Sequence, residues 1–489
     1  MHSTTRWIYG HSPHWIQNLG ISLYGLSYRK ERLGGDYEKY VEGFRTRDRW
    51  SKAQLSAYVE HQLAELLVRA FDQVPHYRKR WSDLKLSRGD LTKLKPSELQ
   101  RLPLTSKAEV RIDPRSFVAA NAGQAEKLRR YDTSGSTGTP IATYCCPSDH
   151  RCFVAAREVR SFNWAGVSIQ MPRAMIGGRS VVPEFEANPP YYRRNRAEKQ
   201  VYFSAYHISR ATAANYVEGF NRYRPEFSTG YAYSHYMLAR AMETEGLRLN
   251  YSPRAFVLSS EALTAEMKST IRRNFGVRAY EEYGAVENCV LATECEHGSL
   301  HVNPDFALVE ILDDAGEPVS EGRPGRVVCT GFANRSQPLI RYDIGDIATW
   351  STQTCACGRN QLPVLSQLIG RLEDIIVGRK GRGILRFHSV FTNLRGVAEG
   401  QVIQDALDCV RVRVVGDANF GADTVRTLQR RVALELGDDI EVKIERVAEI
   451  ERTVRGKFRA VINRLPREVV ESALYSSPET KPSAQAASK

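Results

Sequence analysis

The decapeptide YDTSGSTGTP, residues 131–140, is the most informative stretch of the chain. Gly135 and Gly138 allow its backbone to reach positive φ and to approach a ligand closely. Successive N–H groups in such a loop form a nest for phosphate oxygens. The stretch lacks the lysine of the G-x-x-x-x-G-K-[ST] pattern and the three-glycine dinucleotide fingerprint. Taken alone, it is either a phosphate-binding loop or an ordinary loop rich in serine, threonine and glycine.

The composition is that of a globular protein with more than one domain. The 489 residues are 42% hydrophobic and 26% charged, which excludes collagen-like and wholly disordered chains. A chain of this length predicts two or three domains. No stretch approaches about 18 uncharged apolar residues, so we expect no membrane-spanning helix. The opening MHSTTRWIYGHSPHW has no continuous apolar run, so we expect no signal peptide and a cytoplasmic location.

The charge balance favours anionic ligands. Lys and Arg number 69 and Asp and Glu 56, which gives a net charge of +13. Such a chain attracts nucleotides, phosphates, nucleic acid or an acidic membrane face, unless the charge is only that of a basic surface. The basic residues are spread along the chain without a zinc-finger, helix-turn-helix or RNA-binding signature, so we expect no nucleic-acid partner. The nine cysteines, an odd number, argue against a secreted disulfide framework.

Local patterns predict an α/β region followed by a small α+β domain. Residues 51–81 look helical, with Ser51 as a cap. PRAFVLSSEALT predicts a strand, a loop and a helix, while FALVEILDDAGEPV and GRVVCTGF predict two strands, the first followed by a turn at 314–316. Near residue 371 the pattern changes. VRVRVVGD (410–417) and EVKIERV (441–447) alternate as strands, and Val425, Leu428, Val432 and Leu436 recur at helical spacing between them.

Five short motifs occur in one order along about 330 residues. They are TSGSTGTP, EEYGAVE (281–287), IRYDIGD (340–346), IGRLED (369–374) and RGKFR (455–459). This series resembles the core motifs of the adenylate-forming enzymes, the superfamily of acyl-CoA synthetases. Within it, the chain looks most like the phenylacetate–CoA ligase branch. The segments IQNLGISLYGLSYRKERLGG and VPHYRKRW resemble the CapK-type capsule-biosynthesis subgroup.

The resemblance implies the fold class and the domains. We expect an α/β protein with a large N-terminal adenylate-forming domain of mixed sheets and helices, and a small mobile α+β C-terminal domain. The expected divisions are a helical leader at 1–95, a core that binds ATP and the acid at 96–370, a lid at 371–472 and a disordered tail at 473–489. The polar Pro/Ala/Ser-rich composition of the last residues supports the tail.

The resemblance also implies a reaction. Relatives use ATP to convert a carboxylic acid, aryl or acyl, to an acyl-adenylate with release of pyrophosphate. They then pass the acyl group to CoA or, in other members, to an amine or hydroxyl acceptor. Two readings of other classes stay open: a nucleic-acid-binding or regulatory homologue without activity, and a non-catalytic assembly partner. The sequence leaves the identity of the acid and the oligomeric state open.

Residue roles follow from the matched motifs. Lys457 is expected to be catalytic, because relatives use this lysine in adenylation. Thr137 and Glu287 are expected to bind Mg²⁺, a cation that favours oxygen ligands. Glu373 and Asp374 are expected to form the hinge between the domains. The expected nucleotide-binding residues are Thr133, Ser134, Gly135, Ser136, Thr137, Gly138, Ser260, Glu261, Glu282, Tyr283, Gly284, Asp346 and Arg371.

The second half-reaction and the acid pocket carry weaker signals. After the hinge, IIVGRKGRGILRFHSVF (375–391) is basic and can grip the phosphates of CoA, face another anionic acceptor, or form a solvated hairpin. Aromatic side chains suit an aryl acid through ring packing, or are ordinary core. The candidate wall residues are Tyr206, His207, Tyr231, Tyr233 and His235.

Cysteine and histidine spacing suggests a metal site. Cys295 and His297 lie in ATECEHGSLHVN, and Cys355 and Cys357 lie in TCACGR. Thiolates and imidazoles suit tetrahedral Zn²⁺, and a closed set of four ligands is structural and not catalytic. His301 can replace His297 as the fourth ligand. The alternative is four reduced side chains without a metal.

Overall fold

The structure, a computed structural model of the chain, describes most residues. The described ranges are 8–132, 141–179, 181–183, 188–371, 376–378, 383–384, 388–391, 394, 396–437, 439–451, 458–466 and 468–470. The chain divides into two compact units with a boundary between Leu368 and Ile369. Within the described ranges, no helix combines the length and the apolar character needed to cross a bilayer.

The large unit begins with helices. They are α2 (His14–Leu33), α3 (Tyr37–Arg47), α4 (Lys52–Gln73), α5 (Pro75–Asp83), α6 (Arg88–Lys93), the 3₁₀ helix η1 (Pro96–Arg101) and α7 (Lys107–Ile112). Ser51 caps α4 as predicted, because its side chain accepts from the Gln54 N–H while Gln54 reaches back to the Ser51 N–H. Leu63, Leu67 and Ala70 are fully buried on one face of α4. Burial of one face gives the apolar residues the helical spacing from which this helix was predicted.

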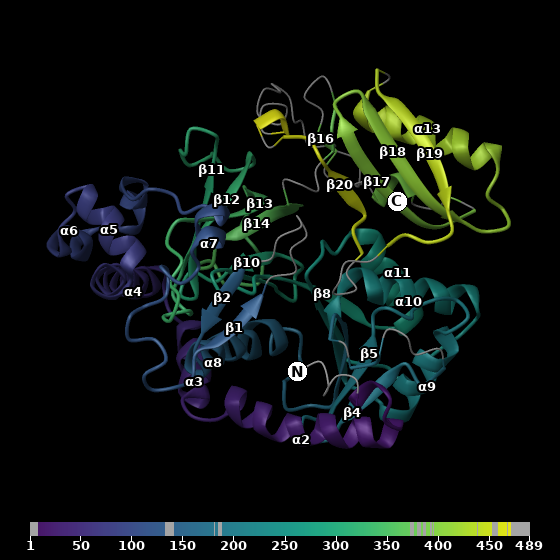
Figure 1. The fold of residues 1–489 in the computed structure, drawn as a ribbon, viewed down its shortest axis with the longest axis horizontal. Coiled ribbons are helices and arrows are strands. Elements are labelled where there is room, and N and C mark those ends of the chain that lie inside the picture. The colour runs from purple at the N-terminus through teal and green to yellow at the C-terminus, as the bar shows by residue number, and fades with distance from the viewer. Residues whose placement is uncertain are drawn as a thin grey trace. The chain divides into compact units, whose positions relative to one another are not determined.

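A 12-stranded sheet is the framework of the large unit (Figure 1). Its strand order is β11-β12-β13-β14-β10-β9-β8-β7-β6-β3-β5-β4. One half holds β3 (Arg173–Gly177), β4 (Tyr192–Asn195), β5 (Gln200–Ser204), β6 (Phe227–Tyr231), β7 (Ala255–Ser259) and β8 (Arg278–Gly284). In this half β5, β3, β6, β7 and β8 run parallel, while β4 pairs antiparallel to β5 at the edge.

Helices follow the parallel strands in the order that such a sheet requires. α9 (Ala213–Tyr223), α10 (Ala232–Thr244) and α11 (Ala265–Phe275) connect β5, β6, β7 and β8. α8 (Pro147–Ala156) and a π-helical stretch, η2 (Arg157–Phe162), precede β3. All five residues of β5 are buried, as expected for a strand covered on both faces. The strand, loop and helix predicted from PRAFVLSSEALT are confirmed as β7 and α11.

The other half of the sheet is antiparallel. It holds β9 (Leu291–Glu294), β10 (Leu300–Val302), β11 (Ala307–Leu312), β12 (Pro324–Gly331), β13 (Tyr342–Trp350) and β14 (Val364–Arg371). The predicted turn is confirmed, since the Gly316 N–H donates to the Asp313 carbonyl and Gly316 has φ +84°. A separate hairpin of β1 (Arg129–Asp132) and β2 (Ala142–Cys145) flanks residues 133–140.

The small unit is α+β, in agreement with the predicted fold class. Its elements are β15 (Ile376–Val377), β16 (Gly383–Ile384), α12 (His388–Phe391), β17 (Val397–Ala406), β18 (Cys409–Gly416), α13 (Ala422–Leu436), β19 (Glu441–Val447) and β20 (Val461–Asn463). Four strands form a sheet in the order β19-β18-β17-β20. Leu428, Val432 and Leu436 of α13 are buried in one core with Val410, Val412 and Val414 of β18. The predicted strand, helix and strand are therefore confirmed.

One buried side chain should make stability depend on pH. His235 of α10 is fully buried, and burial lowers its pKa from 6.5 to about 4. In the unfolded chain the His235 imidazole takes up a proton near pH 6.5, whereas in the folded protein it is protonated only near pH 4. The free energy of unfolding should therefore fall as the pH drops from 6.5 to 4, by about 3 kcal/mol.

Urea unfolding at pH 7 and pH 5 checks this dependence. His235→Gln removes the titrating group, so its loss of stability between the two pH values should be smaller than that of the wild type. Equal losses in the two proteins would show that His235 does not contribute.

Candidate functional site

Residues from four predicted segments lie at one edge of the parallel sheet. Since β5, β3, β6, β7 and β8 are parallel, their carboxyl ends open to the same edge, the usual ligand site of such sheets. His207 follows β5, Tyr231 ends β6, Ser260 follows β7 and Gly284 ends β8. The fold thus gathers segments that are up to 77 residues apart in the chain into one row.

The turn after β7 is held in an unusual conformation. Ser260 has φ +72°, a left-handed conformation that non-glycine residues rarely adopt. Directly after it, Glu261 Oε2 accepts a hydrogen bond of 2.9 Å from the Tyr233 N–H, in the first turn of α10. A carboxylate stabilises a helix N-terminus because the N–H groups there lack partners within the helix. Glu261 therefore fixes this turn beside the start of α10, a role that the sequence did not indicate.

A short hydrogen bond joins two of the predicted nucleotide motifs. The Tyr283 hydroxyl donates to Asp346 Oδ2 at 2.6 Å, so EEYGAVE and IRYDIGD meet at this point. The Tyr283 ring is buried, and burial together with the adjacent Asp346 carboxylate raises its pKa well above the ordinary value. The phenol thus stays protonated and donates to the carboxylate. A carboxylate has about four acceptor positions, so one phenol does not use up its capacity to accept from a ligand.

The irregular stretch of β13 before Asp346 is shaped by Asp343. Asp343 Oδ1 accepts from the Gly345 N–H at 2.9 Å, and Oδ2 accepts from Arg326 at 3.2 Å. Gly345 has φ +75°, which glycine adopts without strain. The two aspartates of IRYDIGD therefore differ in their contacts: Asp343 bonds to Gly345 and to Arg326 of β12, and Asp346 accepts from Tyr283.

The hairpin around the predicted phosphate loop lies beside Glu287. Asn334 Nδ2 donates to the carbonyl of Tyr144 in β2 at 3.1 Å and to that of Glu287 at 3.4 Å. Glu287 is buried, and its Oε1 accepts from the Tyr342 hydroxyl at 3.3 Å. The strand that leads out of residues 133–140 is therefore tied to the residue predicted to bind Mg²⁺.

Glu282 has a partner inside the protein. Its side chain is buried, and Oε2 forms an ion pair of 2.8 Å with Arg157 of η2. Neighbours along a strand face opposite sides of a sheet, so Glu282 and Tyr283 point in different directions. The pair links η2 to β8, and a contact of Glu282 with the nucleotide stays a prediction.

The candidate acid pocket separates into half-buried residues near the strand ends and two buried residues, Tyr233 and His235. His235 was predicted as a wall residue, and the structure corrects this. Its Nε2 lies 2.7 Å from Ser228 Oγ and its Nδ1 lies 2.7 Å from the Tyr231 carbonyl, within the core. Tyr206, His207 and Tyr231 are half-buried near the strand ends. His207 stacks on Tyr191 with ring centroids 4.8 Å apart.

Several predicted residues lie outside the described part of the chain. These are Thr133, Ser134, Gly135, Ser136, Thr137, Gly138, Glu373, Asp374 and Lys457. Arg371 is described only as the last backbone position of β14. Their assigned roles stay predictions.

Four potential metal ligands converge elsewhere in the large unit. The ligand atoms of Cys295, His301, Cys355 and Cys357 all lie within 4.8 Å of one another. Cys295 Sγ is 3.6 Å from Cys355 Sγ, and Cys357 Sγ is 3.3 Å from His301 Nε2. Three thiols and one imidazole are a donor set that suits tetrahedral Zn²⁺.

Of the two candidate histidines, the cluster contains His301 and not His297. Cys295 and Ser299 close a tight turn between β9 and β10, in which the Cys295 N–H donates to the Ser299 carbonyl at 2.9 Å. His297 lies exposed in this turn, whereas His301 is buried in β10. His301 Nδ1 lies 3.2 Å from the Leu362 carbonyl, a contact that directs Nε2 toward the thiols. Burial also lowers the pKa of His301, which keeps the imidazole neutral and able to bind a metal.

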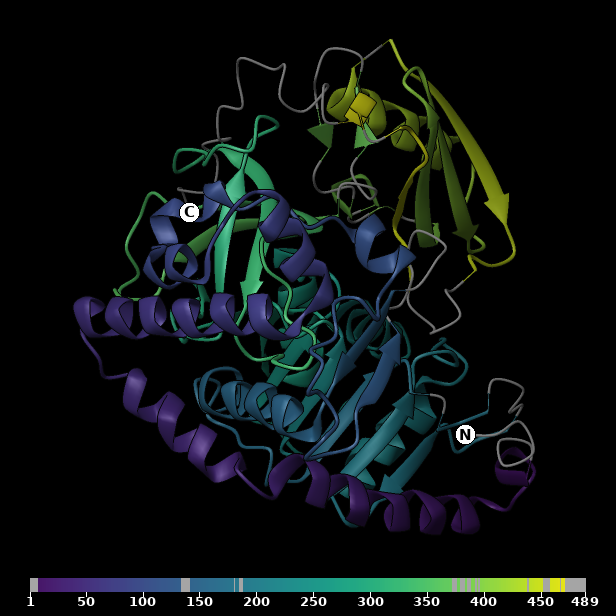
Figure 2. The same cartoon turned by 60° about the vertical axis from the view of Figure 1, so that its left-hand side comes forward.

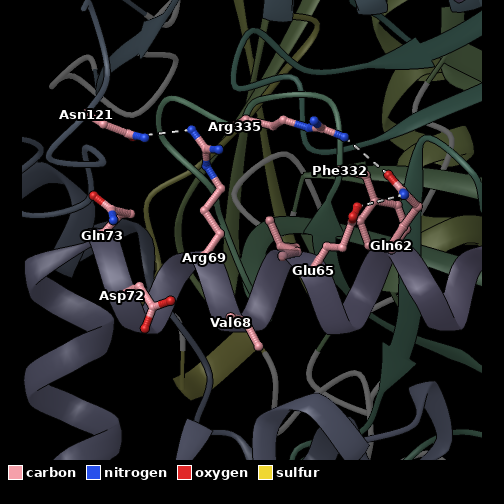
Figure 3. Close-up of a pocket in the computed structure, with 10 residues that line it drawn as sticks. Gln62, Glu65, Val68, Arg69, Asp72, Gln73, Asn121, Phe332 and Arg335 are labelled. Carbon is pink, nitrogen blue, oxygen red and sulfur yellow. Dashed lines mark hydrogen bonds between the residues drawn. The ribbon is translucent and has the colours of Figure 1, made fainter.

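A surface pocket of about 400 Å³ lies along α4 (Figure 3). Arg335 reaches across it to Gln62 Oε1 at 3.4 Å, and Arg69 donates to Asn121 Oδ1 at 3.3 Å. Charges of both signs line the pocket, which gives no preference for a cation or an anion. None of the described residues that were predicted to bind the nucleotide, the acid or a metal lines this pocket.

Comparison with known proteins identifies relatives. The model of a family described as the CapK C-terminal domain matches residues 376–464. Protein CapK of Staphylococcus aureus is 25% identical over 482 residues, which cover 94% of this chain and 99% of that protein. A phenylacetate-coenzyme A ligase of Thermus thermophilus is 26% identical over 338 residues, or 67% of this chain and 73% of that one.

The solved structures agree on the fold. A crystal structure of 2-hydroxyisobutyryl-CoA ligase in the postadenylation state aligns with a TM-score of 0.66 and 21% identity, covering 87% of this chain and 93% of that one. These matches confirm the predicted resemblance to the adenylate-forming superfamily, its phenylacetate–CoA ligase branch and its CapK-type subgroup. They also confirm the expected similarity to ligases that join an acid to coenzyme A.

The position of the histidines predicts which variant loses a metal. Metal analysis of wild-type protein purified without chelator should find about one zinc per chain, because four ligands complete a structural site. His297→Ala should keep the metal, while His301→Ala should lose most of it. Metal-free wild-type protein, or equal zinc content in the two variants, would contradict the site.

Proposed function

We propose that this chain is an ATP-dependent carboxylate-activating ligase. It forms an acyl-adenylate with release of pyrophosphate and then transfers the acyl group to CoA. The Tyr283–Asp346 hydrogen bond carries the proposal, because it unites two motifs of the superfamily at the carboxyl edge of a parallel sheet. Support comes from relatives named as phenylacetate-coenzyme A ligases, which cover most of the chain.

The first half-reaction needs alignment more than proton transfer. An ionised carboxylate attacks the α-phosphorus of ATP, the bond to the bridging oxygen breaks, and pyrophosphate leaves. Because the nucleophile is already anionic, no general base is required. Bringing two anions together instead requires positioning and neutralisation of charge.

Each matched residue has a task in this step. Asp346, oriented by Tyr283, accepts hydrogen bonds from the ribose hydroxyls, and Ser260 with Gly284 borders the adenine. The loop Thr133–Gly138 donates its N–H and hydroxyl groups to the phosphates. Lys457 contributes a positive charge at the carboxylate and the α-phosphate.

Mg²⁺ fits the oxygen donors at the same place. Glu287 is held by Tyr342 and is tied through Asn334 to β2, the strand that follows Thr137 in the chain, so we assign Glu287 and Thr137 as the residues that would hold the ion. When bound, Mg²⁺ neutralises phosphate charge. Zn²⁺ at Cys295, His301, Cys355 and Cys357 would have a structural task, because three thiolates and an imidazole complete a tetrahedral shell.

The proposal that CoA is the acyl acceptor rests on the relatives and not on the geometry of the site. Attack of the CoA thiol on the acyl-adenylate would form a thioester and release AMP. The basic segment 375–391 offers charge for the phosphates of CoA. An amine or hydroxyl acceptor would instead give an amide or an ester from the same adenylate.

Pyrophosphate release with a panel of aryl and fatty acids tests the proposal. We expect release that depends on both ATP and one class of acid, and a thioester when CoA is present. Lys457→Ala should lower release by on the order of 100-fold, the effect of removing one charge-stabilising donor. Lys443→Ala, an exposed lysine of β19 paired with Glu441, is the matched control and should behave as wild type.

The outcomes separate the alternatives. Release without thioester formation would assign an amine or hydroxyl acceptor in place of CoA. A complete lack of release over the whole panel, together with salt-sensitive DNA binding, would overturn the ligase in favour of a regulatory homologue.

Tyr283→Phe tests the link between the two motifs. Loss of a hydrogen bond to a carboxylate costs about 1.5 kcal/mol, so the KM for ATP should rise about tenfold. The ring is retained, and the KM for the acid should change little. Tyr280→Phe on the same strand is the control, since Tyr280 lies under Arg278 and away from Asp346. An unchanged KM for ATP in Tyr283→Phe would contradict the role of this bond.

A further inference from the structure

The first long helix turns its apolar side outward. In α2, Trp15, Leu19, Leu23 and Leu26 are spaced by four, four and three residues, so they lie on one face of the helix. Their side chains are 67%, 52%, 59% and 60% exposed. The adjacent side chains of Ile16 and Tyr24 are exposed as well. Most surface helices of globular proteins show the opposite arrangement, with the apolar face against the core.

The polar side of α2 is occupied by the edge of the sheet. Asn18 Oδ1 accepts from the Arg194 N–H at 2.7 Å, and Ser22 Oγ accepts from the Arg196 N–H at 3.0 Å. Gln17 is buried and accepts from the Arg193 side chain. The spacing fits, because four helical residues rise about 6 Å and two strand residues span about 6.8 Å.

This contact explains why the helix is inverted. β4 is the outermost strand of the 12-stranded sheet, and such an edge presents N–H groups that need partners. α2 runs along this edge (Figures 1 and 2) and supplies those partners from its polar face. Because the polar face of α2 bonds to β4 and the residue after it, the apolar face of α2 points toward solvent. We call the exposed side chains of Trp15, Ile16, Leu19, Leu23, Tyr24 and Leu26 the α2 face.

The α2 face is uncharged, and its surroundings are basic. The next residue on the same line, Lys30, is exposed, as are Arg194 of β4 and Arg196, which directly follows β4. The neighbouring acids are paired: Glu31 with Arg129 at 2.6 Å, and Glu198 with Arg173 at 2.7 Å. An apolar patch with a basic border fits an anionic partner that also accepts apolar side chains.

We propose that the α2 face binds an anionic phospholipid surface, with α2 lying in the plane of the membrane. Amphipathic helices bind in this way through apolar side chains below the headgroups and cations among them. The indole of Trp15 and the phenol of Tyr24 suit this boundary, because each ring has an apolar body and a polar atom. A second copy of the chain is disfavoured as the occupant, since two chains of charge +13 repel one another.

Vesicle co-sedimentation of the full chain tests this proposal without reference to its activity. We expect binding to vesicles of phosphatidylcholine mixed with phosphatidylglycerol, weaker binding to phosphatidylcholine alone, and a loss of affinity at high salt. The double variant Leu19→Glu/Leu23→Glu should bind at least about tenfold more weakly, because two buried leucines are lost from the lipid contact. Its thermal unfolding midpoint should stay close to that of wild type, since both positions are exposed.

Leu434→Glu is the matched control, because this leucine of α13 is also 67% exposed but lies in the small unit. It should bind vesicles as the wild type does. Equal vesicle binding by wild type and the double variant would overturn the proposal. A wild-type dimer that the double variant converts to a monomer, with no vesicle binding by either protein, would also overturn it and assign the α2 face to a second copy.

Discussion

Strand β8 is the constraint on which the large unit depends. It pairs in parallel with β7 on one side and antiparallel with β9 on the other, so two halves of different character meet on this strand. The parallel half gives the sheet an edge at which carboxyl ends gather, and the antiparallel half brings β13 with Asp346 into the same sheet. Tyr283, close to the end of β8, bonds to Asp346 and thereby joins the two halves. A shift in the register of β8 would separate these residues, since successive residues face opposite sides of a sheet.

The chain that follows β8 contributes to the cluster of four potential metal ligands. The chain passes from β8 into β9, turns at Cys295, and returns as β10 with His301. Cys355 and Cys357 come from the loop before β14, which pairs with β10. The cluster thus ties an irregular loop to a hairpin of the central sheet. A metal in this position would stabilise the antiparallel half at a distance from the reaction.

Activation of an acid and attachment to a lipid surface are compatible in one chain. The proposed reaction uses the carboxyl edge of the parallel strands, whereas the α2 face is turned away from the contact of α2 with β4. Neither proposal uses a residue of the other. A ligase held at a membrane would meet acids and acceptors that partition into lipid. The net charge of +13 serves both, because ATP and anionic lipids are negatively charged.

Sequence alone determined what is encoded locally or in the order of motifs. The alternation in 410–416 and 441–447, the stripe of α4 and the cap at Ser51 were readable because each depends on neighbours a few residues away. The tertiary structure alone decided the remaining points. Hairpin geometry brings His301 and not His297 to the three cysteines, and packing places His235 in the core. α2 covers a sheet edge that it meets across 176 residues of sequence. Such contacts depend on register and on burial between distant segments, which the spacing of residues in a single chain does not specify.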